Sequence, residues 1–223
     1  PITTSGDRQK DVPLLDLGRG SFVKEVELAL LGGEIDFAVH SAKDLLSTLP
    51  EGLILAAVSH RSDPRDVQIN CWGESLNNLP KNARIGTSST RRSALVKSIR
   101  SDITILPIRG NVNTRLDKIL SVEYDGVILA AAGIIRIGRD AEITEYLDPN
   151  VFIPEVGQGA LAIEARSDDT EIIEMLSKID HKPSRIAIEV ERSFLEFLGG
   201  GCGTPISAYA RFIDKELKIS TVA

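Results

Sequence analysis

The chain has 223 residues, of which 42% are hydrophobic and 26% are charged, and its formal net charge at pH 7 is −6. That length allows more than one domain. The negative charge excludes general nucleic-acid binding unless the positive residues are clustered. No apolar stretch is long enough to span a membrane. Because Cys71 and Cys202 are far apart, we predict no disulfide framework and expect a cytoplasmic protein.

The first sixty residues predict one helix and two buried strands. Apolar residues recur at helical spacing over 20–34, where Ser21 is a candidate cap and Gly32 a stop. Short apolar runs then predict strands at 34–42 and 53–59. The charged stretch HRSDPRD that follows predicts a crossing into a second domain. The chain begins with Pro1 and ends within a strand-like alternation, so we expect it to be part of a longer protein.

The middle of the chain alternates between strands and helices. ARIGTS, ITILPIR and DGVILAAAGI predict strands, each followed by a polar turn and a helical pattern. This order predicts an α/β domain with a largely parallel sheet. A strand at 160–165 is expected to return to the first domain, and a helix at 184–198 is expected to start at Ser184. Cys71, in VQINCWG, is expected to be a buried strand residue.

Arginine follows each strand of the predicted parallel sheet. The carboxyl ends of parallel strands meet at one edge, where ligands usually bind, and helix N-termini at the same edge favour anions. A guanidinium can bind carboxylate or phosphate through two hydrogen bonds. Scattered solvated arginines are the alternative, but five at corresponding turns favour a polyanionic ligand. The residues are Arg91, Arg92, Arg109, Arg115 and Arg136, with Ser88, Ser89, Thr90, Asn111 and Asn113 at the predicted helix starts.

Two further motifs carry candidate chemistry. HSAKD places Ser41, Lys43 and Asp44 at a strand end, where Asp44 either caps a turn or faces the cationic edge and stabilises a developing cation. LGGGCGTP places Cys202 just after a helix, where the helix dipole disfavours a thiolate. A cysteine hydrolase or a metal site is therefore not expected. The glycines either close the helix or let a bulky group approach.

Longer stretches resemble the porphobilinogen deaminase (hydroxymethylbilane synthase) family. They run in the family's order over most of the chain: GRGSFVKEVELALLGGEIDFAVHSAKDL, DPRD, IGTSSTRR, IRGNVNTRLDKI, YDGVILAAAGIIRIG, VGQGALAIEAR and ERSFLEFLGGGCGTPISAYA. The resemblance implies an α/β fold of two periplasmic-binding-protein-like domains with mixed, mainly parallel sheets around a cleft, and a truncated small α+β third domain. The implied domains are 1–60 with 158–178, 64–154, and 182–223.

The resemblance also implies a transferase. In the family, the cysteine that matches Cys202 holds a dipyrromethane cofactor through a thioether. Four porphobilinogens are joined to this cofactor with loss of ammonia, and water releases the linear tetrapyrrole. The carboxylate that matches Asp44 stabilises the positive charge on the reacting pyrrole nitrogen. Further implied cofactor-binding positions are Lys43, Ser41, Ser89, Arg91, Arg92, Arg109, Arg115 and Gly133; implied substrate-binding positions are Arg19, Lys24, Arg109, Arg115, Arg136 and Gln158.

Several departures from the family pattern stand out. Arg19 replaces a lysine between two glycines, and LLSTLP replaces a stretch with an earlier proline. The family's amino-terminal strand and helix and most of its third domain are missing. Two alternatives stay open: a carboxylate-binding solute receptor with the same two-domain cleft, and a family member that binds pyrroles without turnover. We expect a cytoplasmic monomer that binds porphobilinogen and neither nucleic acid nor membrane, with no metal.

Overall fold

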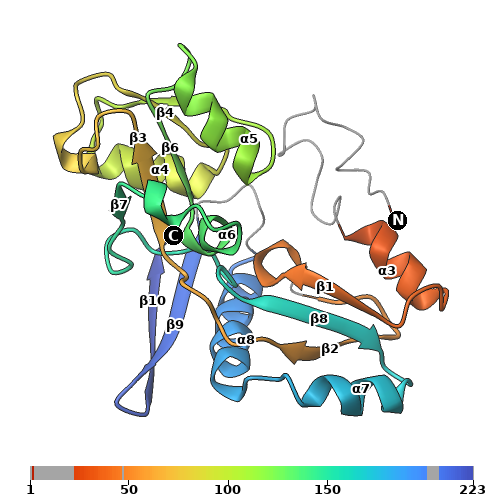
Figure 1. The fold of residues 1–223 in the computed structure, drawn as a ribbon. Coiled ribbons are helices and arrows are strands. Elements are labelled where there is room, and N and C mark those ends of the chain that lie inside the picture. The colour runs from red at the N-terminus through yellow and green to blue at the C-terminus, as the bar shows by residue number, and fades with distance from the viewer. Residues whose placement is uncertain (1, 3–22, 47, 200–205, 223) are drawn as a thin grey trace.

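The computed structural model describes residues 2, 23–46, 48–199 and 206–222. It contains two α/β lobes, and a long helix with a β-hairpin forms a third unit beside them (Figure 1). The α/β fold class with mixed sheets is therefore confirmed. Within the described residues, no helix is both long and apolar enough to cross a membrane.

Lobe 1 is a three-stranded antiparallel sheet in the order β1-β8-β2. Its central strand comes from a part of the sequence about a hundred residues after the other two, so the chain leaves this lobe and returns, as expected. Two helices cover the sheet: Leu30 packs against Ala38, and Leu176 packs against Ile163. The elements are α3 (Lys24–Leu31), β1 (Phe37–Ser41), β2 (Leu53–Val58), β8 (Leu161–Arg166) and α7 (Thr170–Ser177).

Lobe 2 is a five-stranded sheet in the order β5-β4-β6-β3-β7. Strand β4 is parallel to β5 and β6, whereas β3 is antiparallel to β6 and β7. The expectation of mixed sheets is confirmed, but the expectation that they are mainly parallel is wrong. Lobe 1 is antiparallel throughout. In lobe 2 only β4, β5 and β6 are parallel, because the first strand, β3, enters in the opposite direction. The elements are β3 (Asp66–Asn70), β4 (Arg84–Gly86), α4 (Thr90–Ile99), β5 (Thr104–Leu106), α5 (Val112–Asp117), β6 (Gly126–Ala130), α6 (Ala131–Arg136) and β7 (Glu145–Tyr146).

The third unit comprises α8 (Lys182–Phe197) and the hairpin of β9 (Ser207–Ile213) and β10 (Glu216–Val222). Helix α8 begins earlier than predicted: its cap is His181, whose ring nitrogen accepts from the backbone N–H of Ser184. Ser184 is therefore not the cap, and its hydroxyl oxygen accepts from the backbone N–H of Arg61 at 2.9 Å. The prediction for Cys71 is also wrong, because β3 ends at Asn70 and leaves Cys71 exposed in a turn.

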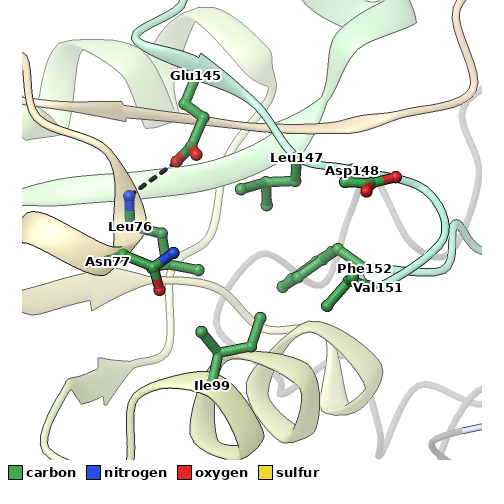
Figure 2. A pocket seen from close by; sticks show the side chains of 8 residues that line it. All are labelled: Leu76, Asn77, Ile99, Glu145, Leu147, Asp148, Val151 and Phe152. Carbon is green, nitrogen blue, oxygen red and sulfur yellow. Dashed lines mark hydrogen bonds between the residues drawn. The ribbon is translucent and has the colours of Figure 1, made fainter.

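A cavity of about 170 Å³ lies on the side of lobe 2 near the end of α4 (Figure 2). Its walls are mostly apolar, and the carboxylate of Glu145 is occupied by the backbone N–H of Leu76 at 2.7 Å. The lining residues are Leu76, Asn77, Ile99, Glu145, Leu147, Asp148, Val151 and Phe152. Because Ile99 is at the C-terminal end of α4, this cavity is remote from the strand edge where ligands were expected.

Two chain segments cross between the lobes, and they lie side by side. We call 59–65 the first crossing segment and 153–160 the second. The backbone N–H of Ser62 donates to the carbonyl of Gly159 at 2.9 Å, and the Gln158 side chain donates to the carbonyl of Pro64 at 2.8 Å. The second segment is largely buried, so it holds both lobes together.

Glycine is required at position 157 of the second crossing segment. Gly157 has a φ of 76°, and a Cβ there would lie 2.8 Å from the backbone nitrogen of Lys43. A side chain would therefore collide with the turn that follows β1 and would also adopt a strained backbone conformation.

We expect Gly157→Ala to lower the free energy of unfolding by about 2–5 kcal/mol, the sum of backbone strain and overpacking. The matched control is Gly33→Ala, since Gly33 has a φ of 72° but a Cβ at this position would meet nothing within 4 Å. That control should lose only about 1–2 kcal/mol. Equal losses in the two variants, measured by denaturant unfolding, would show that the contact with Lys43 does not matter.

Candidate active site

The turns after β4 and β5 lead into helices whose starts are capped as the sequence predicts. The Ser89 hydroxyl oxygen accepts from the backbone N–H of Arg92, and the Asn111 side chain accepts from the backbone N–H of Thr114 at 2.9 Å. Both helices thus begin at the carboxyl edge of parallel strands, with their positive dipole ends toward that edge. This edge is the place where the sequence predicts anion binding.

Arg91 and Arg92 at the start of α4 meet a buried carboxylate, Asp66. The Asp66 oxygens lie 2.7 Å from Arg91 Nη1 and 2.8 Å from Arg92 Nη2. Asp66 is the first residue of β3, and it pairs with Ala130 at the carboxyl end of β6. Because β3 is antiparallel, its beginning lies at the same edge as the ends of the parallel strands. This direction brings the acid to the arginines.

Burial alone would raise the pKa of Asp66, but the two guanidiniums dominate and hold it at about 2. Asp66 is therefore ionised over the whole pH range in which such a protein works. Not all hydrogen-bond donors of Arg91 are used. Its Nη1 donates to the carbonyl of Ile153 at 2.8 Å, while its buried Nε and Nη2 have no hydrogen-bond partner. Unpartnered buried donors are costly and mark a place for an anionic ligand.

Arg109 and Arg115 extend the positive charge along the same edge. Burial lowers the pKa of Arg115, and the charges of Arg92 and Arg109 lower it further, so the guanidiniums lie close enough to repel one another. Arg115 Nε donates to the carbonyl of Gly110 at 2.7 Å. Four of the five predicted arginines therefore gather in one place.

The other predicted basic residues are less constrained. Arg136 is exposed at the end of α6, and Lys24 is exposed at the start of α3. In the described part of the chain, neither has a contact that ties it to the arginine cluster, so their binding roles stay predictions. Arg19 and Cys202 lie outside the described residues.

Lobe 1 contributes Ser41, Lys43 and Asp44 from the end of β1 and the 3-10 turn that follows. Lys43 Nζ lies 4.0 Å from Glu155 Oε2 in the second crossing segment. The charge of Glu155 acts on both Asp44 and Arg91. Glu155 thus lies near both the HSAKD turn and Arg91 of the arginine cluster.

Asp44 is exposed at the surface, yet the dense protein around its carboxyl raises its pKa. The charges of Lys43 and His40 lower the pKa of Asp44, whereas the charge of Glu155 raises it further. His40 itself is buried in lobe 1, with Nε2 2.9 Å from the carboxylate of the fully buried Glu164. His40 is therefore engaged with Glu164.

Gly133 and Gln158 contribute to the packing and hydrogen bonding around the site. A Cβ on Gly133 would lie 3.3 Å from Val112 Cγ2, so this glycine lets α6 and α5 pack closely. Gln158 is fully buried, and its amide bonds the Asp66 carboxylate at 2.9 Å and Arg92 at 3.2 Å. Gln158 is predicted to bind substrate, but its bonds join the second crossing segment to Pro64, Asp66 and Arg92.

The described elements on either side of the cysteine segment are α8 and β9. Helix α8 ends at Phe197, and β9 begins at Ser207. The Ser207 hydroxyl lies within hydrogen-bond distance of the carbonyls of Pro154 and Ile153, and the Ile153 carbonyl also accepts from Arg91. Ser207, the first residue of β9, therefore lies beside the arginine cluster.

Asp66 and Glu155 are site residues that the sequence did not single out. Asp66 stands in DPRD, a motif noted only as part of the resemblance, and the signal for its role is the need of two adjacent arginines for a buried counter-charge. Glu155 carries no local motif. Its position depends on how the second crossing segment runs between the lobes.

Comparisons with known proteins match nearly the whole chain. The family model described as "Porphobilinogen deaminase, dipyromethane cofactor binding domain" matches residues 1–174, and "Porphobilinogen deaminase, C-terminal domain" matches 185–222. A porphobilinogen deaminase of Roseiflexus sp. is 48% identical over 97% of this chain and 72% of its own length. One from Desulforamulus reducens is 48% identical over 99% of this chain and 72% of its own length.

Solved structures with less similarity include the methionine binding protein MetQ, with a TM-score of 0.47 and 14% identity over 80% of this chain and 81% of that one. A periplasmic substrate-binding protein from Coxiella burnetii has a TM-score of 0.44 and 13% identity over 73% and 77% of the two chains.

The two family models together match residues 1–174 and 185–222, and both relatives are 48% identical over nearly the whole chain. The chain belongs to the porphobilinogen deaminase family.

Proposed function

We propose that this protein is a transferase that joins four porphobilinogens head to tail, with loss of ammonia, on a covalently bound dipyrromethane and then releases hydroxymethylbilane by hydrolysis. Family membership over nearly the whole chain supports this function over the solute-receptor alternative. The structural observation that carries the proposal is the unpartnered Nε and Nη2 edge of buried Arg91, next to further arginines and near Asp44. Each pyrrole unit carries an acetate and a propionate, so a growing chain needs such an edge.

The residues present fit a dipyrromethane. Its carboxylates match the open guanidinium edge of Arg91 and the cationic group around Arg115. Ser89 uses its hydroxyl oxygen as an acceptor to cap α4 and keeps the hydroxyl hydrogen for an anion. Once bound, the group supplies the primer to which substrate units are added. The residues proposed to hold it are Cys202, through a thioether, and Ser41, Lys43, Ser89, Arg91, Arg92, Arg109, Arg115 and Gly133.

We further propose that the incoming substrate is bound by the outer part of the same positive surface. Exposed Arg136 and Lys24 can move to meet a carboxylate, because nothing in the described structure fixes them. The residues proposed for substrate binding are Arg19, Lys24, Arg109, Arg115, Arg136 and Gln158; for Gln158, the contribution is to hold Arg92 in place.

Asp44 is the proposed catalytic residue. Loss of ammonia leaves positive charge on the substrate's pyrrole ring, and a carboxylate close to the ring nitrogen stabilises that charge and takes or returns a proton. Burial around its carboxyl raises the pKa of Asp44, which makes the group a better proton acceptor for such transfers. Lys43 beside it carries the opposite charge and favours a substrate carboxylate.

The domain boundaries we propose are 1–60 with 158–178, 64–154, and 182–223. The two crossing segments support them, because the chain passes between sheets at 59–65 and 153–160. A cytoplasmic monomer remains the expectation from the resemblance.

The first test is an intact mass spectrum of the denatured protein after incubation with porphobilinogen. We expect a mass excess of two linked pyrrole units in the parent and none in Cys202→Ser. The matched control is Cys71→Ser, which removes the exposed cysteine after β3 and should keep the full excess. An excess that survives in Cys202→Ser would mean that another residue carries the cofactor.

The second test is Asp44→Asn, for which we expect kcat to fall by about 10²–10⁴-fold with the cofactor still attached. The ionised carboxylate is the active form, so the parent's kcat should fall as the pH drops through the raised pKa of Asp44. This acid limb should be missing from the variant's residual activity. Asp36→Asn, an exposed change in the same lobe, should leave the profile unchanged. A parental kcat in Asp44→Asn would exclude the catalytic role.

A further inference from the structure

Asp66 stands out among the buried charges of the molecule because it meets two consecutive arginines at once. It is fully buried, as are most of the Arg91 and Arg92 side chains, with 3% and 6% of their surfaces exposed. Consecutive residues on a helix point about 100° apart. Two such side chains do not converge on one point unless something between them holds both.

The position of the two arginines is electrostatically unfavourable without an acid. Both stand in the first turn of α4, where the helix dipole is positive and disfavours cations. Their charges also repel each other, and Arg115 adds to the repulsion. In the absence of Asp66, the guanidiniums would gain by moving apart toward solvent.

Asp66 is itself held in place from the second crossing segment. Gln158 donates to Asp66 Oδ1 at 2.9 Å and to the carbonyl of Pro64 at 2.8 Å, and its oxygen accepts from Arg92 at 3.2 Å. Arg92 Nε also donates to Asp66 Oδ1, at 2.9 Å. The arrangement fixes Arg92 on several sides, whereas Arg91 is held by one nitrogen only.

We propose that Asp66 is a positioning residue that, with Gln158, sets Arg91 so that its Nε and Nη2 edge is presented to a carboxylate of the bound dipyrromethane. The held nitrogen of Arg91 is Nη1, which lies 2.7 Å from Asp66 and donates to Ile153. The remaining Nε and Nη2 form the pair of parallel donors that a carboxylate accepts side-on. The inference rests on the proposed function and adds a residue that does not touch the ligand.

The ion pair of Asp66 with Arg91 differs from an ordinary structural ion pair because it leaves hydrogen-bond donors of the arginine without partners. A purely structural pair gains most when every donor is used, as for Arg84, whose guanidinium is bonded to Asp125 and to the carbonyl of Val122. Asp66 and its neighbours instead leave two buried donors of Arg91 without a partner. This costs stability in the free protein and is recovered when an anion binds.

The test compares Asp66→Asn and Asp66→Glu with the control Asp125→Asn. The control removes the charge of another arginine-paired carboxylate in lobe 2, before β6 and at the opposite ends of the parallel strands. Three quantities are measured for each variant: the melting temperature, the arginine Nε–Hε signals in a ¹H–¹⁵N NMR spectrum, and the rate at which porphobilinogen adds the dipyrromethane mass.

For Asp66→Asn, we expect shifted or broadened Arg91 and Arg92 Nε–Hε signals and cofactor loading at least tenfold slower than in the parent. Asp66→Glu keeps the charge but displaces it by one methylene, so it should load at an intermediate rate with its fold intact. Asp125→Asn should lower the melting temperature without changing the loading rate or the two arginine signals. If Asp66→Asn does not fold, Gln158→Leu serves in its place, since it removes the bonds to Asp66 and Arg92 and keeps both charges.

Unchanged arginine signals with parental loading in a folded Asp66→Asn protein would overturn the inference. Slow loading with unchanged signals would also overturn it, because the effect would then not pass through the position of the arginines. If the parent itself gains no mass, the proposed function fails, and the arginine signals still decide whether Asp66 sets the two side chains.

Discussion

The arrangement of the molecule depends on one buried carboxylate, that of Glu191 in α8. Its two oxygens accept from the Arg61 guanidinium at 2.6 Å, from the backbone N–H of Gly157 at 2.8 Å and from the backbone N–H of Ala210 at 2.7 Å. These donors belong to the first crossing segment, the second crossing segment and β9. Burial raises the pKa of Glu191 despite these partners, and an acid in such a place is tolerated only because its hydrogen-bonding capacity is filled. Helix α8 and strand β9 are therefore tied to both crossing segments rather than to one lobe alone.

This attachment has a consequence for the chemistry. A primer that lengthens by one pyrrole at a time needs a fixed point from which its free end can move. Glu191 ties α8 and β9 to both crossing segments, so the described elements on either side of the cysteine segment are held where the lobes are joined. The arginines belong to lobe 2 and Asp44 belongs to lobe 1, so a change in the angle between the lobes would change their relative position.

The sequence predicted the elements well where a local pattern decides the outcome. The strands and helices around IGTSSTRR and IRGNVNTRLDKI are formed as expected, because their caps, Ser89 and Asn111, and their apolar spacing act locally. The prediction was wrong where distant residues decide. Strand β3 runs antiparallel because the chain enters lobe 2 from the hinge, and no periodicity within VQIN specifies that direction. The start of α8 was also misplaced, since His181 takes the capping position while the Ser184 hydroxyl bonds the distant Arg61.

The same distinction separates the predicted site residues from those that were missed. Arginines at strand ends are visible in a sequence because their type and spacing already indicate anion binding. The role of Asp66 is not visible in the sequence, because a single acid at the start of a strand indicates no particular function. Its role becomes clear only when β3 is seen to begin at the edge where Arg91 and Arg92 lie. A cationic site for a polycarboxylate has to be assembled before its ligand arrives, and repulsion among its arginines opposes that assembly. An internal acid that neutralises part of the charge, and is too buried to be displaced by the ligand, resolves this conflict. It keeps the arginines together and still leaves donors free for the substrate's carboxylates.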